Sequence, residues 1–334
     1  MSLSGLSGLS GLSGLSGLSG LSGLSGLSGL SGLSGIHAPL TQAVGPLEAQ
    51  ALMTSRDATS DEVGDWTQEW TPPKTWKPNS RTEWDASDKA LAFDSPDTMG
   101  QSAQHIRHML NLTGLLTSIQ FSTTGFAVAV THSAVPIVSI RRPRYQDFLG
   151  ELDAVQSWAT RREERAAEIL TQVGPQSAFW ASVCHLQPHR TPRTLELMDC
   201  ALTFAMMVCM RFKHAFNCPR PGEYSPNIQP MIPVPGFSAF PSGHATESRM
   251  FSDVMVALTR RTHTPFEGQL HRLSDRIAEN RMVAGLHFPI DGVAGKVLGA
   301  KLAEWFVAQA RTSGHTLNWV WMKAESEMKD LGFL

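Results

Sequence analysis

The sequence has few cysteines, almost no net charge and no long apolar run. Its 334 residues contain 28 Lys and Arg against 30 Asp and Glu, so no overall basic field exists to attract nucleic acid or anionic lipid. Any anion site must therefore be local. The four cysteines form no CxxC pair, which argues against a zinc site or a disulfide framework. Buried free thiols are expected at Cys184, Cys200, Cys209 and Cys218.

Membrane-spanning segments and a standard export signal are also missing. No window approaches the run of about 20 apolar residues that a membrane helix needs. The chain opens with Met1-Ser2 and then repeats Leu-Ser-Gly to Gly35, without the basic start and helical apolar block of a secretory signal. We therefore expect a soluble or loosely peripheral protein, cytoplasmic by default, with no integral membrane span and no nucleic-acid partner.

The first 98 residues differ in composition from the rest. The repeat over 1–35 has glycine at every third position but no proline, which disfavours a collagen triple helix and predicts a disordered low-complexity tail. Residues 36–98 are polar and dotted with proline, and we expect an arm that is anchored by burying its indoles rather than one that binds a ligand. The tryptophans of this arm are Trp66, Trp70, Trp76 and Trp84.

Helical spacing dominates residues 99–334. It predicts helices over 101–118, in a long segment from Pro143, over 179–186, and in a longer helix from Pro192 that has little polar surface and should be central. The charged run from Arg161 to Arg165 is expected to be a solvated face. Only residues 126–140 indicate strand, so the predicted fold is an all-α helical bundle. Further helices are expected over 242–260, 265–284, 289–313 and 317–329.

The first of three charged clusters lies at the end of the central helix and reads Lys213-x6-Arg220-Pro221. Prolines 219 and 221 are predicted to end the helix near Asn217 and to leave Arg220 on an extended turn. There its guanidinium can fork onto two oxygens, while Lys213 supplies a point charge from the helix. Taken alone, each residue is better explained as a surface cation.

The second cluster reads Pro241-Ser242-Gly243-His244. A helix that begins here directs free N–H groups and the positive end of its dipole at an anion, and Gly243 lets the backbone come close. Ser242 can donate its hydroxyl, and His244 is placed for proton transfer. Taken alone, an ordinary serine N-cap followed by a chance histidine explains the tetrapeptide equally well.

The third cluster reads Arg281-x5-His287-x3-Asp291. Pro289 marks a helix start, so His287 lies just before the helix and Asp291 within its first turn. The Asp291 carboxylate can hold one imidazole nitrogen and raise the nucleophilicity of the other. With Arg281 as the third cation, the clusters together describe an oxyanion site over residues 213–291 that surrounds a tetrahedral anion such as phosphate or vanadate.

In this order the three segments resemble the signature shared by type 2 phosphatidic acid phosphatases, bacterial class A acid phosphatases and vanadium-dependent haloperoxidases. This sequence departs from the family's pattern at Asn280, where the family usually has serine. The resemblance implies the helical bundle of that family, with 99–334 as the catalytic domain. It also implies that His287 bonds covalently to phosphorus or vanadium, that Asp291 orients it and that His244 is the acid–base residue. The oxyanion would be held by Lys213, Arg220, Ser242, Gly243 and Arg281.

Two activities are compatible with such a pocket. A haloperoxidase would hold vanadate on His287 as its cofactor and oxidise halide with hydrogen peroxide. A phosphatase would need no cofactor and would hydrolyse phosphate monoesters through a phosphohistidine. Ala245-Thr246 and Ala284-Gly285-Leu286 look more like haloperoxidase members, so haloperoxidase is the first expectation and metal-independent phosphatase the alternative. A non-catalytic oxyanion binder, which would need neither His244 nor Asp291, is the third.

Overall fold

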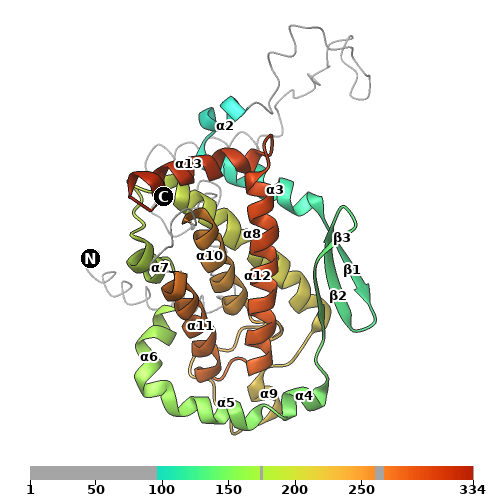
Figure 1. The fold of residues 1–334 in the computed structure, drawn as a ribbon. Coiled ribbons are helices and arrows are strands. Elements are labelled where there is room, and N and C mark those ends of the chain that lie inside the picture. The colour runs from blue at the N-terminus through green and yellow to red at the C-terminus, as the bar shows by residue number, and fades with distance from the viewer. Residues whose placement is uncertain (1–95, 174–175, 260–266, 334) are drawn as a thin grey trace, which may run out of the picture. The chain divides into compact units, whose positions relative to one another are not determined.

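The computed structural model of this chain describes residues 96–173, 176–259 and 267–333. The predicted tail over 1–35 lies outside the described residues, and so does the predicted arm over 36–98 apart from its last three positions. The described part is 67% helix and 8% strand, which confirms a mostly helical fold (Figure 1).

The described elements follow one another in the order α2 (Pro96–Gln101), α3 (Gln104–Ser118), β1 (Ile119–Thr124), β2 (Ala127–His132), β3 (Val135–Arg141), α4 (Tyr145–Leu149), α5 (Leu152–Trp158), the 3₁₀ turn η4 (Ala159–Arg161), α6 (Arg162–Thr171), α7 (Ser177–Cys184), α8 (Pro192–Phe216), α9 (Pro221–Tyr224), α10 (Gly243–Thr259), α11 (Glu267–Val283), α12 (Pro289–Arg311) and α13 (Thr316–Asp330).

Helix α8 is the centre of the bundle, as predicted. It begins at Pro192, which suits a first turn because proline lacks the N–H that a helix leaves unpaired there. Helices α3, α10, α12 and α13 all pack against it, and Leu197, Phe204 and Phe212 are fully buried between them. In Figure 1, α8, α10, α11 and α12 run lengthwise together, while α4, α5 and α9 lie at one end of the bundle.

Two glycines of α12 set its distance from α10. A Cβ at Gly295 would lie 2.5 Å from the carbonyl oxygen of Ser242, and one at Gly299 would collide with the carbonyl oxygen of Thr246. Because glycine has no side chain, the two helices can approach closely at these positions. Helix α12 packs more extensively against α10 than against any other described element. The first turns of α10 and α12 are therefore held next to each other.

The segment 126–140, predicted as strand, forms two strands, β2 and β3, of a three-stranded antiparallel sheet in the order β1-β2-β3. Val128, Val130, Val138 and Ile140 are buried at alternate positions of β2 and β3, which is the period of a half-buried strand. Strand β1 was not predicted. It follows α3 directly and exists because it pairs with β2, which is a contact that local spacing does not report.

The prediction of one long helix from Pro143 is wrong, because the chain forms four successive shorter elements there: α4, α5, η4 and α6. The solvated face expected over the run from Arg161 to Arg165 is also wrong at its last residue. Arg165 is buried, and its Nη1 donates a hydrogen bond of 3.0 Å to Oδ1 of Asn280. The reason is that α6 packs against α11, and this buries the arginine between them.

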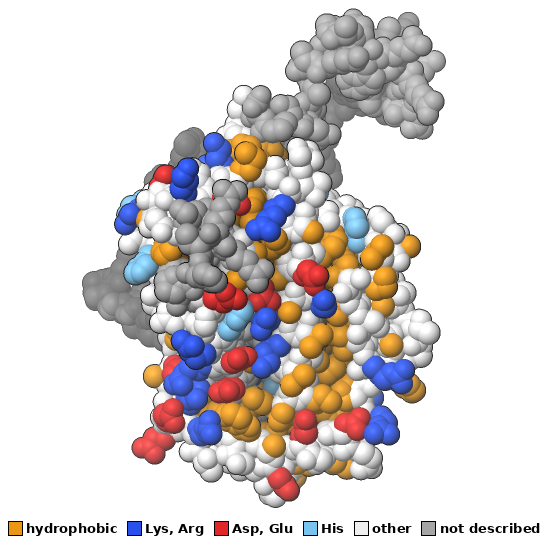
Figure 2. Space-filling view, in the orientation of Figure 1, with side chains coloured by type: hydrophobic (Ala, Val, Ile, Leu, Met, Phe, Trp, Pro, Cys, Tyr) orange, Lys and Arg blue, Asp and Glu red, His pale blue; other side chains and the backbone are white. Residues whose placement is uncertain are grey.

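The outer side of α12 is apolar near the helix start. Val293 is 57% exposed and Val297 is 48% exposed. Hydrophobic side chains gather beside α12 in the lower part of the face that Figure 2 shows. None of the described helices is sufficiently long and apolar to cross a membrane. All four cysteines are buried and free, as predicted, and burial raises the pKa of the Cys184 thiol to about 12.

Candidate active site

The end of α8 places the first predicted cation. Asn217 adopts a left-handed conformation with φ 45°, and its N–H closes the helix with a bond of 3.0 Å to the carbonyl oxygen of Lys213. The helix therefore ends where the prolines predicted. The Lys213 side chain is buried, and its Nζ donates to the carbonyl oxygens of Ser238 at 2.8 Å and Ala239 at 2.9 Å.

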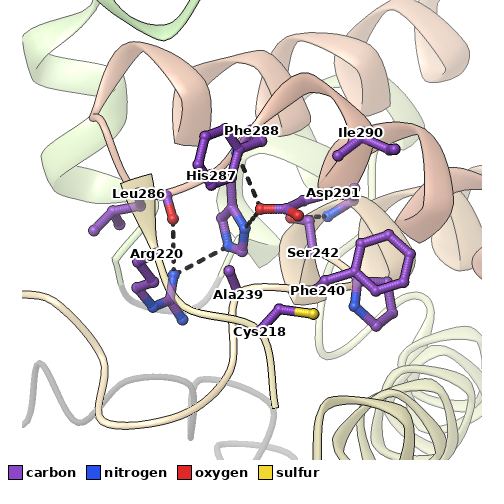
Figure 3. Close-up of polar contacts among 12 residues, drawn as sticks. Cys218, Arg220, Ala239, Phe240, Ser242, Leu286, His287, Phe288, Ile290 and Asp291 are labelled. Atoms are coloured by element: carbon purple, nitrogen blue, oxygen red, sulfur yellow. Dashed lines mark hydrogen bonds and ion pairs between the residues drawn. The ribbon is translucent and has the colours of Figure 1, made fainter. Parts of the chain in front are cut away.

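Arg220 lies on extended backbone just before α9, as predicted, with φ −90° and ψ 162°. Its guanidinium donates to the carbonyl oxygens of Phe237 at 3.1 Å and Leu286 at 3.0 Å. Its Nη1 also lies 3.4 Å from Nε2 of His287, so the arginine faces the predicted nucleophile (Figure 3).

A left-handed turn brings Arg281 and His287 to the same end of the bundle. Gly285 has φ 77°, and its N–H donates to the carbonyl oxygen of Met282 at 2.8 Å. The N–H of Leu286 donates to the carbonyl oxygen of Arg281 at 3.0 Å. This pair of bonds is the Schellman ending of a helix, which favours glycine at the left-handed position.

Arg281 is buried and has no charged partner among the residues that the structure describes. Its Nη2 donates to the carbonyl oxygen of Ile169 at 3.2 Å and lies 3.4 Å from Oε1 of Gln172. Its Nε is buried and has no hydrogen-bond partner among the described residues. A donor left open in this way is suited to an anionic ligand.

His287 and Asp291 are in contact, as their spacing predicts. Nδ1 of His287 lies 2.9 Å from Oδ2 of Asp291, and the N–H of Phe288 donates to the same oxygen at 3.0 Å (Figure 3). The N–H of Ser242 donates to the main-chain oxygen of Asp291 at 2.9 Å. Because an ionised carboxylate only accepts, the proton of the neutral imidazole sits on Nδ1 and the lone pair of Nε2 is left toward Arg220.

The Pro-Ser-Gly-His segment forms the start of α10. Ser242 is buried, and its Oγ accepts from the N–H of Ala245 at 3.4 Å, as in an N-cap. A Cβ on Gly243 would lie 3.8 Å from Cε of Lys213, so the missing side chain leaves room beside this cation. Nε2 of His244 donates to the carbonyl oxygen of Gln172 at 2.9 Å, which leaves the lone pair of the neutral ring on Nδ1.

The three buried cations of the site have no carboxylate in ion-pair contact within the described part of the chain. Lys213, Arg220 and Arg281 are held by carbonyl oxygens, an amide oxygen and an imidazole nitrogen. Burial lowers the pKa of Lys213 to about 8 and lowers the pKa values of Arg220 and Arg281 to about 10. All three remain positively charged at neutral pH, and Asp291, which makes no ion pair with any of them, offsets at most one of the three charges.

Both histidines of the site are neutral at neutral pH. Burial, followed by the charge of Arg281, lowers the pKa of His244 to about 3. Burial, followed by the charges of Arg220 and Lys213, lowers the pKa of His287 well below its usual value. Burial also raises the pKa of Asp291, although the hydrogen bond from Phe288 opposes this shift. The neutral His287 therefore keeps a free lone pair on Nε2.

These groups surround a small cavity of about 40 Å³. Six of the eight residues predicted for the site line it: Lys213, Arg220, Gly243, His244, Arg281 and His287. The other two, Ser242 and Asp291, do not line the cavity. Asp291 holds the lining residue His287 from behind, and Ser242 caps the start of α10. The rest of the wall is apolar or sulfur-containing apart from one carboxyl group, that of Glu247.

Residues 198–315 match the family model described as the PAP2 superfamily. This part of the chain belongs to the PAP2 superfamily. The match contains every charged, hydroxyl or histidine residue predicted for the site, from Lys213 to Asp291. No curated protein matches the chain. The PAP2 match begins after α3, the sheet and α4–α7, so the residues that these elements add to the site are known only from the structure.

Gln172, next to the end of α6, is the main residue of the PAP2 site that the sequence did not indicate. Its carbonyl oxygen accepts from His244, and its Oε1 accepts from Nδ2 of Asn280 at 2.9 Å and contacts Arg281. Asn280 also donates to Oε2 of Glu168 at 3.0 Å, so the amide that replaces the family's usual serine links α11 to α6. Nothing in the local sequence marks Gln172, because its role depends on that packing.

Two carboxyl groups were also missed. Oε2 of Glu151 accepts from the N–H of Ile290 at 3.0 Å and so caps the helix that carries Asp291. Glu247 lines the cavity from α10, one helical turn after His244. Its spacing of three residues from a predicted site histidine is a signal that the sequence did contain.

Proposed function

We propose that this PAP2 protein is an enzyme that binds a tetrahedral oxyanion among Lys213, Arg220 and Arg281 and reacts through Nε2 of His287. The observation that carries the proposal is the group of three buried cations that make no ion pair with a carboxylate of the described residues. Burying unpaired charge costs several kcal/mol, roughly, so such an arrangement is expected where a ligand supplies the counter-charge. The start of α10 at Gly243, which lines the cavity, adds the positive end of a helix.

The same residues fit vanadate. Nε2 of His287 offers a lone pair for coordination, and the three cations with the open Nε of Arg281 offer donors for the oxygens. Bound vanadate would supply the activation of hydrogen peroxide for halide oxidation. In that reaction His244 would take up a proton from peroxide at Nδ1, because its neutral ring can accept one. The segments Ala245-Thr246 and Ala284-Gly285-Leu286, which resemble those of haloperoxidases, make a vanadate-dependent haloperoxidase the first candidate.

A metal-independent phosphatase is the second candidate, and the His287–Asp291 contact favours it. Nε2 of His287 would attack phosphorus and form an N–P bond as the ester P–O bond breaks, and His244 would protonate the leaving oxygen. Water would then cleave the phosphohistidine. His244 must carry a proton here, and the charge of a bound phosphate raises its pKa by offsetting the nearby cations.

One pair of assays separates these candidates. Bromide oxidation is measured with hydrogen peroxide after adding vanadate, and p-nitrophenyl phosphate hydrolysis is measured without any metal. We expect bromination that depends on vanadate and is lost in His287→Ala, whereas His214→Ala, an exposed histidine of α8, leaves it unchanged.

Rapid ester hydrolysis that vanadate only inhibits would replace the first candidate by the second. Vanadate binding without either activity would support a non-catalytic oxyanion binder. Full activity in His287→Ala would show that the assignment of the nucleophile is wrong.

A further inference from the structure

We propose that Glu247 is a further oxyanion-binding residue of this site and that it contacts the anion as a neutral carboxylic acid. The inference rests on the proposed oxyanion site and adds one requirement to it. A proton must be present on this carboxyl group for the anion to bind tightly.

Glu247 lies inside the site. Its side chain projects from α10 one helical turn after His244 and lines the same cavity as Lys213, Arg281 and His287. A Cβ on Gly243 would lie 3.6 Å from Oε1 of Glu247 and 3.8 Å from Cε of Lys213. The carboxyl group and the lysine therefore border the same space beside Gly243, where the oxyanion is expected.

The Glu247 carboxyl group makes no hydrogen bond or ion pair with any residue that the structure describes. Asp291 differs, because its Oδ2 receives bonds from His287 and Phe288. Glu247 is half-buried, so its carboxyl group has less water around it than an exposed one. An ionised carboxylate without protein donors is disfavoured there, whereas a neutral acid needs only an acceptor for its O–H. An oxyanion in the cavity supplies that acceptor.

Charged and titratable groups face Glu247 from every element around the cavity. Lys213 favours its ionised form, but burial outweighs this effect and raises the pKa of Glu247 to about 7. Burial likewise raises the pKa of the nearby Cys209 thiol, so that group adds no charge. The remaining groups at the cavity are Arg220 after α8, His244 on α10, Arg281 on α11, His287 before α12 and Asp291 behind it.

The charges of the site explain why the neutral form is required. With Asp291 ionised, the three cations leave two positive charges, which match a dianion. An ionised Glu247 would leave only one and would repel the anion at short range. A neutral Glu247 donates a hydrogen bond to it instead.

The pH dependence follows from this linkage. Because the anion binds the protonated form, its affinity falls as pH rises through the Glu247 pKa of about 7, by about tenfold for each further pH unit. Lys213, whose pKa is about 8, and Asp291, whose pKa is raised by burial, lose their protons in adjoining ranges. Only a comparison with a variant that cannot ionise at residue 247 separates Glu247 from these two groups.

The test uses molybdate, a tetrahedral dianion that does not titrate near neutral pH, and titration calorimetry on the full chain. Glu247→Gln keeps a donor and cannot ionise. We expect the ratio of the wild-type Kd to the variant Kd to be near one at about pH 6 and to reach about ten at about pH 8. Glu304→Gln, an exposed carboxyl group of α12, should give a ratio of one at both. A Glu247→Gln ratio that does not change with pH would overturn the inference.

Failure of the proposed function gives a different result. If wild-type protein does not bind molybdate, or if Arg281→Ala binds it equally well, the oxyanion site itself is wrong. If Glu247→Gln does not fold, infrared difference spectra of wild-type protein labelled with ¹³C-glutamate replace it. A carboxylic acid band from glutamate should then appear when molybdate is added at about pH 8, and its absence would contradict the inference.

Discussion

The two ends of α8 bury positively charged side chains in opposite ways. Near its first turn, Arg107 of α3 donates to both oxygens of Glu196, at 2.6 and 2.9 Å, and Arg193 donates to the same carboxylate at 2.6 Å. Near its last turn, about 25 Å farther along the helix axis, Lys213 donates only to carbonyl oxygens. One end pairs its cations directly with a carboxylate, and the other makes no such ion pair among the described residues.

This difference separates stability from function. The Glu196 cluster gives the buried Arg107 a carboxylate partner within the fold, so breaking it should weaken the fold. The Lys213 end, together with Arg220 and Arg281, keeps an excess of positive charge that weakens the fold and attracts an anion. A mutation at one end should therefore change a quantity that the corresponding mutation at the other end leaves nearly unchanged.

The largest effect is expected from Glu196→Ala. The variant leaves Arg107 buried without its carboxylate, so the free energy of unfolding should fall by about 3–5 kcal/mol, measured by urea denaturation. Molybdate affinity should change less than about twofold in the protein that remains folded. Glu304→Ala, which removes an exposed pair with Lys301, is the control and should cost less than about 1 kcal/mol. If Glu196→Ala also lost less than about 1 kcal/mol of unfolding free energy, the two ends of α8 would not differ in their contribution to stability.

Arg281→Ala should give the converse result. Turnover, in whichever assay the wild type is active, should fall by about 10²–10³-fold because the variant lacks one of the donors to the bound oxyanion. The free energy of unfolding should change by less than about 1 kcal/mol, since an unpaired buried charge is removed with its bonds. Arg272→Ala, an exposed arginine of the same helix, should leave both quantities unchanged. Loss of stability without loss of turnover would show that Arg281, like Arg107, stabilises the fold and does not bind the oxyanion.

Lys213→Met tests the energetic cost of the unpaired end. The folded protein holds the Lys213 pKa at about 8, below the value of 10.5 for a free lysine side chain, so the protonated lysine destabilises the fold below pH 8. The variant should be more stable than wild type at about pH 7, by up to about 2 kcal/mol after losing two hydrogen bonds. Wild-type stability should recover as pH rises from about 8 to 10.5, and the difference should disappear there. A difference that is constant with pH would contradict this account.

The sequence predicted the part of the site whose geometry is local. Asn217 ends α8 because prolines follow it, Gly285 turns the chain between Arg281 and His287, and Asp291 reaches His287 within four residues. These contacts depend on neighbours in the chain, so spacing was enough to find them. The clusters then converge because Gly295 and Gly299 bring α12 against α10. The sequence did not indicate this role of the two glycines.

The remaining contacts come from distant packing. Strand β1 depends on pairing with β2, and the long helix expected from Pro143 is divided into shorter helices that pass the end of the bundle. Gln172 enters the site only because α6 packs against α11, and Arg165 is buried by the same packing. No periodicity in or next to α6 distinguishes Arg165 and Gln172 from the solvated positions beside them. Their partners in the site are more than 70 residues away in the chain.

The smallest effect is expected from a variant that adds a carboxylate at the Lys213 end of α8, so that this end resembles the Glu196 end. Gln172→Glu places a carboxylate beside Arg281, whose Nη2 lies 3.4 Å from Oε1 of the present side chain. The new ion pair competes with the ligand, so molybdate should bind about tenfold more weakly at neutral pH. Gln172→Met, of similar size and uncharged, is the matched control and should lose less affinity. If both variants lose the same amount, the position of Arg281 rather than the absence of a counter-charge is what makes this end bind anions.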